Sequence, residues 1–111
     1  MIRFRHVDMT ELARNYGVFY FFEKVGDALP PHIHPPEEDH TVLVLQGRAI
    51  VRYPTMAVEL APGESFMVDG RIRHSVAALE PNTATFHGYV NGRPSFYDGL
   101  AKDNFEGTLG G

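Results

Sequence analysis

The chain has 111 residues, a formal net charge of −4 at neutral pH and no cysteine. A chain of this length can bury a core as one domain without a disulfide or a structural metal. The lack of cysteine excludes disulfides, thiolate metal sites and a cysteine nucleophile, which leaves histidine and carboxylate as the strong metal ligands. The acidic balance, without a basic stripe, argues against a nucleic-acid partner or an anionic membrane surface.

The N-terminal stretch shows no targeting pattern. Residues 1–17, MIRFRHVDMTELARNYG, alternate charged with apolar side chains and so lack the apolar core of a signal peptide. No apolar run reaches the roughly 18 residues that a membrane-spanning helix needs. We therefore expect a cytoplasmic protein with no membrane partner, folded as a single domain over residues 1–111.

Taken in chain order, the predicted elements are almost all strands. The stretch MIRFRHV is expected to be a strand that is free to cross to a partner chain, and residues 9–16, MTELARNY, are the only expected helix. Short segments rich in β-branched and aromatic residues, separated by Gly, Pro, Asn and Asp, then predict strands. These strands are expected at residues 17–26, 41–47, 48–53, 57–60, 65–69, 73–79 and 83–90.

Turn residues separate the predicted strands. Residues 54–56, Pro-Thr-Met, and Asn91-Gly92 predict turns, and the tail from about residue 100 is expected to be loosely ordered. Many short, evenly spaced strands are typical of a sandwich or a closed barrel, which leaves few exposed strand edges. The expected fold class is therefore all-β, with at most one short helix.

Three of the six histidines lie within residues 32–40. His32 and His34 are two positions apart, so in an extended segment their side chains leave the same face with origins about 7 Å apart. Two imidazoles placed in this way can converge on one ion at about 2.1 Å. Pro31 and Pro35 hold the pair extended, because a proline disfavours helical backbone at the residue before it.

His40 begins an apolar strand, TVLVLQ, and shares one face of it with Val42 and Val44. Apolar residues occupy both faces, which predicts a strand buried on both sides and a His40 side chain that points into the interior. A neutral imidazole buried there is satisfied if it binds a metal. His87 shares a face with Thr85 and Tyr89, and two positions remain open for it, in the barrel lining or on the surface.

These residues resemble the two motifs of the cupin superfamily, over about residues 17–90. In the first motif, Gly26 is followed by five residues, the His32-x-His34 pair and, later, Gly47. In the second motif, residues 62–64, Pro-Gly-Glu, stand where the family has Pro-Gly-Asp, and His74 occupies the last ligand position.

The resemblance implies a cupin-type β-barrel, a double-stranded β-helix of the jelly-roll kind. It also implies one divalent transition-metal ion, Fe, Mn, Zn, Ni or Cu, at one end of the barrel. The implied ligands are His32, His34, His40 and His74. A small-molecule ligand or substrate and a homodimer are the expected partners.

One ligand position has two possible occupants. Counting six residues back from Gly47 places His40 where the family has glutamate, whereas counting forward from His34 reaches Glu38 or Asp39. A slip of one residue would reverse the faces of the strand, while a loop can absorb an insertion. We therefore assign the position to His40, with Glu38 as its substitute if the register is the other one.

The cupin fold hosts many reactions, so the reaction has to be argued from the site. The first hypothesis is a mononuclear metal enzyme that acts on a small organic molecule, with a dioxygenase as the leading class. The alternatives are a non-catalytic ligand-binding or sensor cupin with a structural metal, and a cupin isomerase or lyase. Ala78 stands where the fuller second motif carries asparagine, so the family's substrate contacts do not transfer directly.

Overall fold

The computed structural model describes residues 2–9, 15–33, 40–89 and 105–108, and these form strands, turns and bends only. No helix in this part of the chain is long and apolar enough to cross a membrane. The strands are β1 (Ile2–Met9), β2 (Asn15–Phe22), β3 (Ala28–His32), β4 (His40–Gln46), β5 (Ala49–Arg52), β6 (Ala57–Leu60), β7 (Ser65–Val68), β8 (His74–Ala78), β9 (Thr83–Tyr89) and β10 (Phe105–Thr108).

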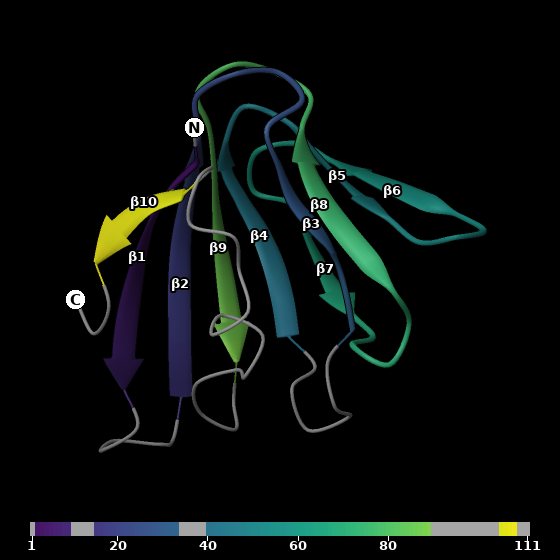
Figure 1. The fold of residues 1–111 in the computed structure, drawn as a ribbon, viewed down its shortest axis with the longest axis horizontal. Helices are drawn as coiled ribbons and strands as arrows, with labels where there is room; N and C mark the ends of the chain where they lie inside the picture. The colour runs from purple at the N-terminus through teal and green to yellow at the C-terminus, as the bar shows by residue number, and fades with distance from the viewer. Residues whose placement is uncertain (1, 10–14, 34–39, 90–104, 109–111) are drawn as a thin grey trace.

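The strands form two sheets, which Figure 1 shows as the two walls of the molecule. The larger sheet has the order β10-β1-β2-β9-β4-β7 and the smaller one β3-β8-β5-β6. From β3 to β9 the chain passes back and forth between the sheets, and neighbouring strands are antiparallel except for the parallel pair β1 and β10. The all-β cupin-type barrel predicted from the sequence is confirmed.

The core lies between the sheets and follows the alternation of each strand. Residues that point inward are fully buried, for example Val18, Phe22 and Val44 of the larger sheet and Val51 and Val76 of the smaller sheet. Each buried aliphatic or aromatic side chain of this size stabilises the fold by roughly 1.5–3 kcal/mol. This apolar core supports the barrel end at which the histidines gather.

The helix expected over residues 9–16 is wrong at both ends. Met9 belongs to β1 and Asn15 begins β2, while residues 10–14 lie outside the described ranges. The two strands pair in continuous register from Ile2 opposite Phe22 to Met9 opposite Asn15. The ladder pairs the backbone groups of Met9, Asn15 and Tyr16, so at these residues the tertiary context overrides local helix propensity.

The first strand is not a free edge. It pairs with β2 on one side and with β10 on the other, where Ile2 lies opposite Phe105. Strand β10 falls within the tail that was expected to be loosely ordered, and its pairing with β1 explains the order of residues 105–108. The turn predicted at Asn91-Gly92 lies outside the described residues.

The other predicted turn is confirmed. Strands β5 and β6 form an antiparallel hairpin whose connection contains Pro54, Thr55 and Met56. The backbone N–H of Tyr53 donates to the Met56 carbonyl at 2.8 Å, which closes the turn.

Strand β4 ends at a bulge and a glycine that no other residue can replace easily. The register of β4 against β9 shifts between Val44 and Gln46, so this strand does absorb an extra residue, contrary to the expectation from the sequence. Gly47 follows with a φ of 75°, and a Cβ added there would collide with Thr83. Thr83 is itself fixed, because the Arg48 N–H donates to its hydroxyl oxygen at 3.3 Å.

Candidate functional site

Buried polar side chains gather at one end of the barrel, the lower end in Figure 1, where β4 and β8 begin and β3 and β9 end. His40 is 3% exposed, and His74 and His87 are each 1% exposed. Tyr20 and Tyr89 are buried beside them. Among the residues whose side chains the structure describes, no carboxylate is buried in the core. The chemistry of this end of the barrel is therefore that of imidazoles and phenols.

His40 and His74 face each other across the interior, one from each sheet. Their ring centroids lie 5.9 Å apart with an angle of 48° between the ring planes. Since an imidazole nitrogen binds Zn²⁺ at about 2.1 Å, the centroids of two ligand rings lie within roughly 6.4 Å of each other. The observed separation therefore fits two histidines that share one ion.

The orientation of the His74 ring is fixed by a backbone group. Its Nδ1 lies 2.7 Å from the Ile72 carbonyl oxygen. A carbonyl oxygen can only accept, so in the neutral ring Nδ1 carries the proton and the lone pair is on Nε2. Histidine ligands in metal sites are commonly held in this way by a second hydrogen bond.

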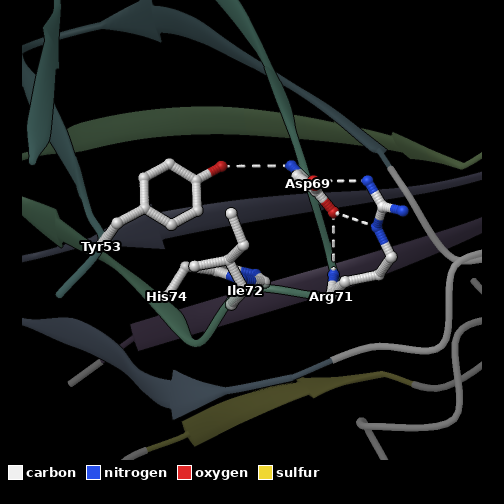
Figure 2. Close-up of polar contacts among 5 residues, drawn as sticks. All are labelled: Tyr53, Asp69, Arg71, Ile72 and His74. Carbon is white, nitrogen blue, oxygen red and sulfur yellow. Dashed lines mark hydrogen bonds and ion pairs between the residues drawn. The ribbon is translucent and has the colours of Figure 1, made fainter. Parts of the chain in front are cut away.

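A compact turn positions that carbonyl, as Figure 2 shows. The Asp69 carboxylate accepts from the Arg71 backbone N–H at 3.1 Å and from the Arg71 guanidinium at 2.9 and 3.0 Å. The backbone N–H of Asp69 donates to the Tyr53 hydroxyl at 3.1 Å, which ties the turn to the end of β5. The hydrogen bonds from Arg71 hold the pKa of the Asp69 carboxyl below its usual value of 3.8.

We expect Asp69→Asn to loosen this turn and to lower thermal stability slightly at neutral pH. Because the pKa of Asp69 is lower in the folded chain, its contribution is present above the unfolded pKa and is lost as the pH falls through the folded pKa. The difference in Tm between the wild type and the variant is thus expected to be constant from about pH 5 to 8 and to shrink below about pH 4. A difference that grows in acid would contradict this assignment.

Aromatic rings pack against His40. The Tyr89 ring stacks on His40 at 4.4 Å, and the His87 ring lies 5.4 Å from it in a nearly parallel plane. Tyr20 meets His87 edge-on at 4.8 Å, and His87 Nε2 lies 3.1 Å from the Thr85 hydroxyl. These contacts hold the His40 ring in place.

The sequence left the position of His87 open, and the structure places it in the barrel lining. The sequence analysis did not single out Tyr20 or Tyr89 as site residues. The signal was present in the alternation, since Tyr20 shares the inward face of β2 with Val18 and Phe22. The pattern predicts a core position for a tyrosine at this place in the strand. Only the pairing of β2 with β9 shows that Tyr20 lies next to His87.

The predicted ligands are only partly within the described residues. His40 and His74 are brought together, and the backbone of His32 ends β3 directly opposite His74. His34 and Glu38 lie outside the described ranges, and nothing is described of the His32 side chain. The residues that the structure describes contain no group of three or more ligand side chains arranged to hold a metal ion. The four-histidine site therefore stays a prediction.

Comparison with known proteins points to one family. The model of the cupin domain matches residues 19–90, which span both motifs. The structure of KdgF from a Halomonas species is similar, with 27% identity and a TM-score of 0.64 over 78% of this chain and 74% of that one. No curated protein sequence matches the chain significantly.

Two further solved structures are similar in fold. A cupin superfamily protein from Desulfitobacterium hafniense has 17% identity and a TM-score of 0.64, and covers 78% of this chain and 76% of that one. An RmlC-like cupin from Desulfovibrio desulfuricans has 22% identity and a TM-score of 0.61, with coverages of 78% and 82%. Barrel, motif positions and family match agree, and this chain belongs to the cupin superfamily.

Proposed function

We propose that this cupin binds one divalent transition-metal ion through His32, His34, His40 and His74 and uses it to transform a small organic molecule. The proposal rests mainly on the buried pair of His40 and His74, whose rings lie 5.9 Å apart. The hydrogen bond from His74 Nδ1 to Ile72 leaves Nε2 as the coordinating atom. When bound, an ion held by neutral imidazoles keeps its full double charge and acts as a Lewis acid.

The chain's own residues would orient the ligands and exclude water. Stacking of Tyr89 on His40 fixes the ring plane, and the burial of both rings keeps bulk solvent away. An isomerase or lyase needs a positioned acid and base. His87 and Tyr89 beside His40 are groups of this kind, so the isomerase or lyase is kept as the alternative to the dioxygenase that we propose first.

Metal analysis of the purified protein, followed by O₂-uptake assays with small acids, phenols and diketones, tests the proposal. We expect close to one transition-metal ion per chain and O₂ consumption with one of these substrate classes. A bound metal without turnover would favour the ligand-binding or sensor alternative, and turnover without O₂ would favour an isomerase or lyase. A metal-free protein whose Tm is indifferent to chelators would contradict the site itself.

Acid is expected to release the metal. Each imidazole must be neutral to bind, and its ordinary pKa is about 6.5. Metal binding lowers the effective pKa, so release should occur below pH 6.5 and steeply, because several ligands protonate together. Metal content measured after dialysis across this range checks the prediction. Full occupancy at about pH 4 would indicate carboxylate ligands instead.

We further propose that the chain forms a homodimer through the outer face of the larger sheet. Phe19, Leu45 and Met67 are 41%, 47% and 71% exposed on this face. The described outward positions of β2, β9, β4 and β7 carry no charge. The Arg3 guanidinium of β1 lies 5.4 Å from the Phe21 ring at one edge of this surface, so the uncharged part that two copies could share lies over β9, β4 and β7. Three strands about 4.8 Å apart and about 20 Å long make an apolar surface of a few hundred Å², the size that marks an interaction surface.

Met67→Glu is expected to shift the protein from dimer toward monomer, because pairing would bury the new charge. Met56→Glu serves as the control, since Met56 is 52% exposed in the β5–β6 turn, away from this face. Sedimentation velocity of both variants and the wild type measures the effect. A wild-type protein that is monomeric at high concentration would exclude the dimer.

A further inference from the structure

A cavity lies at the edge of the smaller sheet, beside the start of β8, the strand that carries His74. Its volume is about 220 Å³, and Arg52, Tyr53, Arg73, His74 and Ser75 line it together with two prolines. A space of this size admits a small molecule. His74 lines both this cavity and the interior surface that holds His40, so the cavity adjoins the candidate metal site.

Strand geometry explains why two arginines and a serine share this cavity. Arg52 on β5 lies directly opposite Ser75 on β8. Successive residues of a strand point to opposite faces, so Arg73 and Ser75 lie on the outer side while His74 between them is buried. Both arginines are exposed, and Ser75 lies opposite Arg52 and two residues after Arg73.

The charge of the cavity is opposite in sign to that of the whole chain. Among the residues that the structure describes, none that lines the cavity is acidic. Three other arginines each pair with a carboxylate: Arg3 with Glu23 at 2.7 Å, Arg48 with Glu59 at 3.1 Å and Arg71 with Asp69 at 2.9 Å. No such pair involves Arg52 or Arg73 among the described residues. The cavity therefore concentrates positive charge in a protein with a net charge of −4.

We propose that this cavity is a binding site for a small oxyanion, either a carboxylate or a phosphate group. Arginine presents N–H donors in a planar fork that matches both groups, and the Ser75 hydroxyl adds a further donor. The Tyr53 ring and the two prolines supply an apolar surface for the rest of the ligand. The groups that would bind the anion belong to Arg52, Arg73 and Ser75, none of which is a proposed metal ligand, so the proposal does not depend on the proposed function.

Calorimetric titration at low ionic strength with inorganic phosphate, and separately with malonate, tests the proposal. We expect saturable binding of at least one probe, and the tighter of the two identifies the preferred group. Arg52→Gln and Arg73→Gln should each weaken binding at least about tenfold, because each removes charge-assisted hydrogen bonds. Arg48→Gln is the matched control, since Arg48 precedes the same strand and pairs with Glu59 outside the cavity; it should change affinity by less than about twofold.

The main competing explanation is an anion that binds to a metal ion instead. His40→Ala and a chelator-treated wild type are therefore titrated in parallel, and both should bind the probe as the untreated wild type does. Loss of binding in these two samples, with retention in Arg52→Gln, would overturn the proposal. Equal weakening by Arg48→Gln, or no saturable binding of either probe, would overturn it as well. Metal analysis of the wild type tests the proposed function independently of these outcomes.

Discussion

His40→Ala is expected to strip the chain of most of its metal, while Glu38→Ala leaves the metal content unchanged. His40 is 3% exposed on the inward face of β4, and its ring lies 5.9 Å from that of His74. Loss of an outer-shell partner of a metal ligand commonly costs 10–100-fold in affinity. We therefore expect the loss of a ligand itself to exceed about a hundredfold. Metal content of the two purified variants, measured side by side, gives the answer.

The two variants exchange phenotypes if the ligand set contains glutamate. In that case Glu38→Ala loses the metal and His40→Ala keeps it, and the assignment of His40 is wrong. His87→Ala is a useful companion, because His87 is as buried as His40 and stacks against it. A general loosening of the barrel end would affect all buried histidines alike, whereas a ligand role predicts a much larger loss of metal for His40 than for His87.

Gly47→Ala is expected to lower the free energy of unfolding by roughly 2–4 kcal/mol, the sum of a strained backbone and a steric clash. The φ of Gly47 is 75°, which L-residues adopt only at a cost. The new Cβ would also meet the backbone and side chain of Thr83. Thermal unfolding should show a decrease in Tm of roughly 9–17 °C.

Gly63→Ala separates the cost of the strained backbone from the cost of the steric clash. Gly63 has a similar φ of 85°, but nothing lies near the position of its Cβ. Only the backbone cost then applies, so we expect a loss of about 1–2 kcal/mol. If both variants lose the same stability, the contact with Thr83 contributes nothing and the collision is relieved by a small shift of β9.

The strand pattern was readable from the sequence because its physical cause is local. Short segments rich in β-branched and aromatic residues, bounded by turn residues, located β4 to β9. The position of His40 on one face with Val42 and Val44 gave the inward direction of its side chain. The helix expected around Met9 failed for a different reason. Met9, Asn15 and Tyr16 pair in the ladder between β1 and β2, and pairing between strands cannot be recognised in the sequence of one segment.

The candidate site was predictable only in part for the same reason. The motif positions identify His40 and His74 by their spacing from glycines. The contacts of His40 with Tyr89 and His87 depend on the register of β4 against β9, which contains a bulge that spacing alone does not reveal. The role of the Ile72 carbonyl could not be predicted from the sequence either. The carbonyl belongs to the backbone of the turn, so a residue with any side chain at position 72 could accept this hydrogen bond.

The parallel pairing of β1 with β10 has a consequence for synthesis of the chain. A ribosome releases β1 first, and its β10 partner emerges only after all the other strands have been made. Until then the outer edge of β1 exposes unpaired backbone groups, which can recruit the same edge of another nascent chain. An affinity tag is therefore better placed away from β10, and slow translation of this chain should favour aggregation unless a chaperone covers β1.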